Sequence, residues 1–246
     1  MSYELIVKMQ NTCKNCNEPV NSNYCPNCGQ PVKLKKIDKY YIIQEFGDFF
    51  FANKGMVYTV KNVFIRPGDS VKRFITEDRY RFVKPITFLF LVTLIYALAV
   101  HLFNINTDYV INVDLGEDET ISPVVYWLME NPRYIITIMA LFVAFWLKIF
   151  FRKAGYNFFE IFILMCFVTG ISTLIDTIGA IIHKGTNWHL MQIAIFINTI
   201  YVTWAIGQFF GKKKVASYVK AFLSYALGAL SLGILVAIIT IITFLK

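Results

Sequence analysis

Five long runs of mainly apolar residues follow Pro85, and they restrict the fold more than any other feature of the chain. A helix that crosses a bilayer needs about 20 apolar residues, because each residue rises about 1.5 Å through a hydrocarbon core of about 30 Å. Only 16% of the residues are charged, against about 25% in an average soluble domain. The sequence predicts an all-α polytopic membrane protein, with about five transmembrane helices at residues 86–103, 134–151, 158–182, 190–210 and 219–245.

A shorter apolar stretch precedes the second of these spans. Ser122-Pro123 is typical of a helix start, but the VVYWLM that follows is too short to cross a bilayer. We expect an interfacial helix here, with Tyr126 and Trp127 at the level of the lipid headgroups.

The distribution of lysine and arginine between the spans predicts their orientation, because these residues are retained on the cytoplasmic side. Residues 106–123, between the first two spans, contain neither lysine nor arginine. Lys148, Arg152 and Lys153 lie between the second and third spans, and residues 212–214 form a lysine triplet between the last two. We therefore expect a cytoplasmic N-terminus and an external C-terminus.

Four cysteines near the N-terminus form two CxxC units, Cys13 with Cys16 and Cys25 with Cys28. Thiols stay reduced in the cytoplasm, where paired CxxC units indicate a metal site. Four thiolates complete a tetrahedral shell around one structural Zn²⁺ and leave no position for a catalytic water. Iron or a redox dithiol is the alternative. We predict a zinc-ribbon domain over residues 1–36, with a short hairpin between the two knuckles.

The second knuckle, YCPNCGQ, has Gly29 directly after its last cysteine, and Asn17 stands at the equivalent place in the first. Glycine adopts positive φ without strain, and asparagine is among the next most tolerant residues. We therefore expect both residues to have positive φ in turns that fold around the metal.

Residues 37–85 are both aromatic and basic, and charges recur too often for any part of the segment to span a membrane. Arg66-Pro67-Gly68 interrupts it, and we expect Asp69 or Ser70 to cap the helix that follows. Val71, Phe74 and Ile75 recur at helical spacing in that helix. It either lies in the membrane interface as an amphipathic helix or packs on the transmembrane bundle.

The CxxC and YCPNCGQ units, RPGDSVKRFI and DRYRFVKPITFLFL follow one another in an order that resembles an uncharacterised bacterial family of small membrane proteins. The family is known only as a domain of unknown function, and the resemblance covers roughly residues 13–100. It implies a bacterial inner (cytoplasmic) membrane location and a zinc ribbon, and it implies no activity. The residues that match the family pattern are Arg66, Pro67, Asp78, Arg79, Lys84 and Pro85.

Four cations cluster before the first span: Arg66, Arg79, Arg81 and Lys84. Pro85 disfavours helix at Lys84, so the spanning helix can begin there at a new angle. Arg79, Arg81 and Lys84 then remain at phosphate depth. The four cations contact lipid headgroups or an acidic partner, or they serve as a topological anchor.

Asp176 is an ionisable residue inside the third span, which makes it a candidate functional group. Its candidate partners on other spans are Asn198, Thr199, Thr203, Ser224 and Tyr225, and His101 lies at a comparable depth. This group could form a proton or ion path, or only hydrogen bonds that hold helices together. Two other residues of this span have simpler interpretations, Glu160 as an interfacial ion pair and Cys166 as a buried apolar residue.

The chain has no GxSxG, P-loop or HExxH motif and no paired carboxylates at catalytic spacing, so no catalytic residue is predicted. The first functional hypothesis is an interaction, scaffold or regulatory protein of a membrane complex, in contact with membrane lipids and with a protein partner or another copy of the chain. The alternative is a small transporter, channel or lipid-moving protein that uses Asp176. The net charge of +8 is explained by topology and does not favour nucleic acid.

Overall fold

The computed structural model describes residues 11–29, 31, 55–103, 105, 132–186 and 190–244. Its elements are two short strands, seven α-helices and one 3₁₀ turn: β1 Asn11–Thr12, β2 Pro19–Val20, α2 Met56–Ile65, α3 Pro67–Thr76, α4 Pro85–Leu102, α6 Pro132–Phe150, η3 Arg152–Ala154, α7 Phe158–Thr186, α8 Leu190–Gly211 and α9 Val215–Phe244. The expected interfacial helix after Ser122 and residues 37–54 lie outside the described part.

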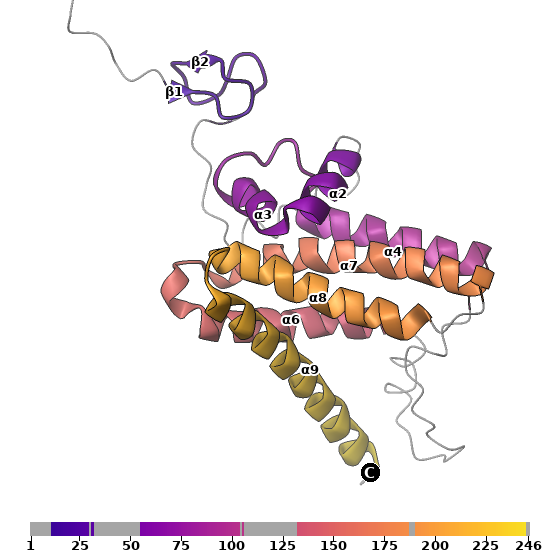
Figure 1. Cartoon of the computed structure of the whole chain (residues 1–246). Coiled ribbons are helices and arrows are strands. Elements are labelled where there is room, and N and C mark those ends of the chain that lie inside the picture. Colours follow the sequence, from indigo (N-terminus) through magenta and orange to yellow (C-terminus); the bar gives the residue numbers. More distant parts are fainter. Residues whose placement is uncertain are drawn as a thin grey trace, which may run out of the picture.

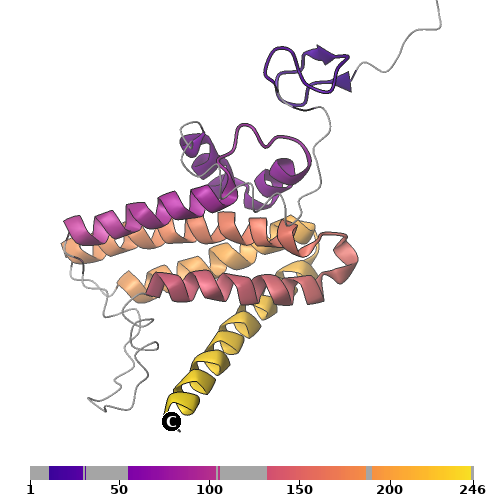
Figure 2. The ribbon, with the colours of Figure 1, turned by 180° about the vertical axis from the view of Figure 1, so that it is seen from behind.

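A bundle of α4, α6, α7, α8 and α9 forms the main body, with α7 at its centre (Figure 1). In the 18-residue apolar stretch of α7, 72% of the residues are buried inside the protein, against 11% in the corresponding stretch of α9. Both views show the C-terminal half of α9 diverging from the other helices (Figures 1 and 2). Most of the apolar surface of α9 therefore makes no contact with the other described helices.

A helix stands at each of the five predicted spans, within a few residues of the expected bounds. Among the described residues, three helical stretches are long and apolar enough to cross a membrane: Pro85–Leu102, Phe158–Ile182 and Val215–Ile242. The apolar part of α6, Ile135–Phe150, is shorter. The helical bundle and three candidate spans are confirmed, and the number five stays a prediction.

Helices α2 and α3 lie on the same side of the bundle as α4, over the part of α7 and α8 where α7 begins and α8 ends (Figure 1). Val71, Phe74 and Ile75 of α3 are buried there. Phe74, Phe82 and Phe88 each pack against Phe167 of α7, with ring centroids 5.3–6.3 Å apart. Of the two alternatives for this helix, packing on the bundle is the one observed.

Helix α3 begins earlier than the expected cap at Asp69 or Ser70. Pro67 occupies its first turn and Arg66 is the N-cap residue, so Asp69 and Ser70 both lie inside the helix. Proline fits there because the first turn needs no N–H from it. The hydroxyl of Ser70 instead donates to the carbonyl of Asn62 in α2, at 2.8 Å, and so ties the two helices together.

Candidate functional site

Two similar turns build the N-terminal cysteine cluster. In the first, the N–H of Asn17 donates to the carbonyl of Cys13 at 2.9 Å, and in the second the N–H of Gly29 donates to the carbonyl of Cys25 at 2.8 Å. Asn17 has φ 60° and Gly29 has φ 71°. The prediction of positive φ at both positions is confirmed, and each CxxC unit turns both of its sulfurs to one side.

The strand pair of this module differs from the hairpin predicted between the knuckles. Asn11 pairs with Val20 and Thr12 with Pro19 in an antiparallel ladder. The strands therefore bracket the first knuckle, and only β2 comes from the segment between Cys16 and Cys25. Both strands have two residues, which is too short for the alternating pattern that identifies a strand in a sequence.

The four sulfurs of Cys13, Cys16, Cys25 and Cys28 all lie within 4.8 Å of one another. The shortest separations are 3.5 Å for Cys13 with Cys28 and for Cys16 with Cys25. In a tetrahedral site with Zn–S bonds of about 2.3 Å, the sulfurs would be about 3.8 Å apart. The arrangement therefore has the size and the donor set that a metal ion requires.

Backbone hydrogen bonds favour a thiolate in this cluster. The N–H groups of Cys16 and Asn15, together with the neighbouring thiols, lower the pKa of the Cys13 thiol to about 7, although burial opposes them. The thiolate is the form that binds a metal. At Cys16, burial and the neighbouring thiols outweigh a backbone hydrogen bond and raise the pKa to about 11, so the cluster favours the thiolate at Cys13 over Cys16.

Arg81 connects the cysteine module to the helical body. Its guanidinium donates to the carbonyl of Asn15, inside the first knuckle, at 2.6 Å. The same side chain lies 3.7 Å from the buried carboxylate of Asp78. That carboxylate also accepts from the N–H groups of Tyr80 and Arg81 and so shapes the turn before α4. The first knuckle is thus hydrogen-bonded to the residue that this turn positions.

Close approach and hydrogen bonds fasten α3 to α8. A Cβ at Gly68 would lie 2.4 Å from the backbone N of Phe209 and 2.5 Å from the carbonyl carbon of Gln208. The N–H of Gly68 donates to the Gln208 side chain at 2.7 Å in a buried position. In the RPG motif, Pro67 therefore starts the helix. Gly68 has no side chain, and this lets α3 approach the backbone of α8 closely.

Two further bonds join α2 and α3 to α8 and to the residues directly after it. Tyr201 of α8 donates its hydroxyl to the carbonyl of Val63 at 3.0 Å, and Lys212 pairs with Asp69. Sequence reasoning missed Gln208 and Tyr201. The available signal was a glutamine near the end of an apolar run, since such a residue needs a partner in the protein.

The four cations predicted to contact lipid headgroups or a partner differ in the contacts they make within the protein. Arg79 donates to the carbonyls of Phe74 and Ile75, at 3.3 and 3.0 Å, and so caps the end of α3. Lys84 is the N-cap residue of α4, and Arg81 contacts the cysteine module as described. Contact of these four cations with lipid headgroups or an acidic partner stays a prediction.

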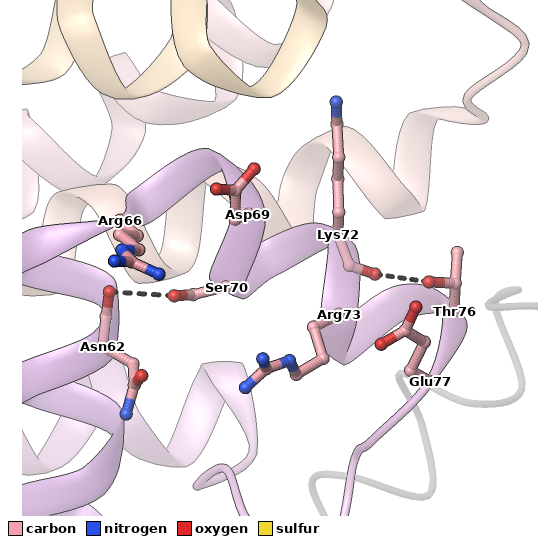
Figure 3. A pocket seen from close by; sticks show the side chains of 8 residues that line it. All are labelled: Asn62, Arg66, Asp69, Ser70, Lys72, Arg73, Thr76 and Glu77. Atoms are coloured by element: carbon pink, nitrogen blue, oxygen red, sulfur yellow. Dashed lines mark hydrogen bonds between the residues drawn. The ribbon is translucent and has the colours of Figure 1, made fainter. Parts of the chain in front are cut away.

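Arg66 lies in a polar cavity of about 390 Å³ between α2 and α3 (Figure 3). The lining side chains come from these two helices and from the residues that flank α3, and they include Asn62, Lys72, Arg73 and Glu77. The cavity is on the exposed side of α3, since the opposite side carries the buried residues.

Asp176 and Asn198 meet between α7 and α8, as predicted: the amide of Asn198 donates to the Asp176 carboxylate. The amide oxygen of Asn198 is buried without a hydrogen-bond partner within the described ranges. His101, expected at a similar depth, is exposed in the last turn of α4. The structure thus joins two of the three predicted intramembrane polar residues.

The two residues of α7 that were given simpler interpretations, Glu160 and Cys166, have structural roles. Glu160 forms a capping box with Asn157: the Asn157 side chain accepts from the Glu160 N–H and the Glu160 carboxylate accepts from the Asn157 N–H, both at 2.8 Å. This reciprocal cap replaces the predicted ion pair as the explanation of an acid at this helix start. Cys166 is buried, as predicted.

Comparison with known proteins places a family match on the α2–α4 part of the chain. The matching family is described as a protein of unknown function (DUF3667), and its model matches residues 53–97. No curated protein and no solved structure matches the chain. The resemblance expected over residues 13–100 is thus confirmed for an uncharacterised domain over residues 53–97, and the cysteine module lies outside the matched residues.

Proposed function

We propose that this protein is an integral protein of a bacterial inner membrane that presents a cytoplasmic zinc ribbon to a protein partner, as an interaction or regulatory component of a membrane complex. It has three parts in this proposal: the ribbon over residues 1–36, a basic, aromatic segment over residues 37–85 and a transmembrane domain of five spans over residues 86–246. The contact between ribbon and partner is the function, and no chemical step is assigned to the chain.

The arrangement of the loops supports the proposed orientation. Phe151, just before η3, stacks on Phe210 at the end of α8 with ring centroids 3.8 Å apart, and Lys212 pairs with Asp69 of α3. The η3 segment with Arg152 and Lys153, the lysine triplet and α3 therefore share one end of the bundle. This is the end that the positive-inside rule assigns to the cytoplasm.

The donor set supports zinc as the metal. Four thiolates suit Zn²⁺ and iron alike, but structural zinc sites with two CxxC units are the commoner use of such a module. Four protein ligands also fill a tetrahedral shell, which suits a structural ion. Zinc would then stabilise a module whose buried apolar residues, within the described part of it, are Cys13, Val20 and Cys25.

The proposal depends chiefly on one observation: the ribbon is held to the helical body while an aromatic side chain on it remains exposed. Arg81 fixes the first knuckle through the carbonyl of Asn15, and Tyr24, just before the second knuckle, is 64% exposed. Exposed tyrosine is enriched at protein interfaces, where its ring contributes large contact area. Tyr24 is therefore the residue that we expect to contact the partner.

Photo-crosslinking in native membranes tests this function. A photoreactive amino acid at position 24 of the full chain should capture one discrete protein, and the Cys25→Ser, Cys28→Ser variant should lose that product. The matched control carries the same probe at position 80, because Tyr80 is exposed to 66% but lies outside the ribbon. The proposal fails if position 24 captures nothing, or if capture persists without the cysteines.

The Asp176–Asn198 contact favours a second candidate function, a small transporter or channel. A carboxylate beside an amide oxygen without a partner offers acceptors to a proton or a small cation within the described bundle. The same contact is also an ordinary interhelical hydrogen bond, which is worth only about 0.6–1.7 kcal/mol.

Asp176→Asn separates these two roles, because it keeps an oxygen that can accept from Asn198 while it removes the charge. If Asp176 carries ions, proteoliposomes with the variant should lose ion flux at unchanged thermal stability. Glu160→Gln is the control, since it removes the other acid of α7 and glutamine still completes a capping box. Equal flux from Asp176→Asn and the native chain would exclude the transport function.

A further inference from the structure

The cavity between α2 and α3 has an electrostatic character that the proposed function does not use. Three of its lining residues are cationic, Arg66, Lys72 and Arg73, and two are acidic, Asp69 and Glu77. Asp69 pairs with Lys212 of the neighbouring loop, which offsets its charge. With Lys212 counted, four positive charges stand against two negative ones at this cavity.

The two arginines are the cations available to a ligand. Lys72 lies over the ring of Phe209, 5.7 Å from its centroid, and Figure 3 shows Lys72 and Asp69 pointing away from Arg73 and Asn62. Arg73 donates one N–H to the hydroxyl of Tyr58 at 3.2 Å. Neither Arg66 nor Arg73 has an ion-pair partner in the part of the chain that the structure describes.

The ends of these side chains face a common space. In Figure 3 the guanidinium groups of Arg66 and Arg73 and the amide of Asn62 border the same opening, with Glu77 on the other side of Arg73. A guanidinium offers five N–H donors in a planar fork that fits two oxygens of a phosphate group at once. Two such groups at one cavity match the charge and the geometry of a phosphate better than those of a carboxylate.

We propose that this cavity binds an anion with a phosphate group, held by Arg66 and Arg73. The phosphate belongs either to the headgroup of an anionic phospholipid or to a soluble phosphorylated molecule. Asp69, in the cavity wall, pairs with Lys212 directly after α8, so the cavity lies at the end of a predicted span. That is the depth of a headgroup phosphate. The site is independent of the ribbon and of Asp176.

The test uses the purified full chain and a charge-matched pair of variants. Arg66→Gln, Arg73→Gln removes two charges from the cavity. Lys61→Gln, Arg152→Gln removes two exposed charges from outside it. Native mass spectrometry measures how much phosphatidylglycerol each protein retains from vesicles of phosphatidylcholine with 20% phosphatidylglycerol, and thermal unfolding measures stabilisation by inorganic phosphate.

If the phosphate belongs to a lipid, the native chain and the Lys61, Arg152 control should retain phosphatidylglycerol, and the cavity variant should retain at least tenfold less. If it belongs to a soluble molecule, inorganic phosphate should raise the unfolding temperature of the first two proteins but not of the cavity variant. If the glutamine variant does not fold, an Arg66→Lys, Arg73→Lys variant takes its place. It should bind phosphate more weakly than the native chain, because lysine lacks the planar donor fork of the guanidinium. The proposal is overturned if the cavity variant matches the native chain in both measurements, or if the control loses as much as it does.

Discussion

Replacing Gly68 by alanine is expected to detach the start of α3 from α8 and to lower the free energy of unfolding by about 3 kcal/mol, the upper part of the usual range for overpacking. The new Cβ would meet backbone atoms of Gln208 and Phe209 at 2.4–2.8 Å. Backbone within a packed helix cannot turn aside as the end of a flexible side chain can. The two helices must separate, and the buried bond from the Gly68 N–H to Gln208 is lost with them.

Thermal unfolding of the detergent-purified protein, followed by circular dichroism, measures this effect. Tryptic cleavage after Arg73 should also become faster, because that bond lies in the helix that is released. Gly233→Ala in α9 is the matched control, since nothing lies within 4 Å of a Cβ there. Alanine is better than glycine inside a helix by about 1 kcal/mol, so the control should be neutral or stabilising. Equal behaviour of the two variants would refute the tight contact between α3 and α8.

The Cys25→Ser, Cys28→Ser variant is expected to lose its bound metal and to unfold the N-terminal module while the helices stay folded. Structural zinc supplies about 10–16 kcal/mol of binding free energy to modules of this kind. The buried set of the module, Cys13, Val20 and Cys25, is separate from the core of the helical body. Loss of the metal should therefore unfold the module and leave the helical bundle folded.

Metal analysis of the purified chain should give about one zinc per native chain and none per double variant. The helical circular dichroism signal and its unfolding temperature should be nearly equal in the two proteins. Cys166→Ser is the matched control, because that cysteine is buried in α7 and is not one of the four clustered thiols. Retention of metal by the double variant, or its loss from the Cys166 control, would contradict a site made of these four cysteines.

Features whose determinants lie close together in the sequence were predicted best. The spacing of each CxxC unit, with Asn17 or Gly29 after it, decides a turn of five residues, and both turns have the expected positive φ. Lys84-Pro85 starts α4 as predicted, because proline restricts its own φ and the residue before it. Long apolar runs likewise became helices, since their length and composition leave few other folds.

Features that depend on distant partners could not be predicted. The need for glycine at position 68 arises from its close contact with Gln208, 140 residues away in the sequence. The four cations before α4 look equivalent in the sequence, yet Arg79 turns back to carbonyls of the preceding helix, α3, and Arg81 reaches the cysteine module. The tertiary structure decides which partner each cation contacts, and the pattern of charges in the sequence does not show this.

The contact between α3 and α8 has a consequence for the order in which the chain can fold. Gln208 leaves the ribosome roughly 7–28 s after Gly68, at 5–20 residues per second. During that interval Val71, Phe74 and Ile75 have no α8 to pack against. We expect the α2–α3 segment to wait at the membrane surface, or on a chaperone, and to dock only after α8 has been made. Docking of α2 and α3, which are synthesised early, would then occur only once α8, which is synthesised late, has folded into the bundle.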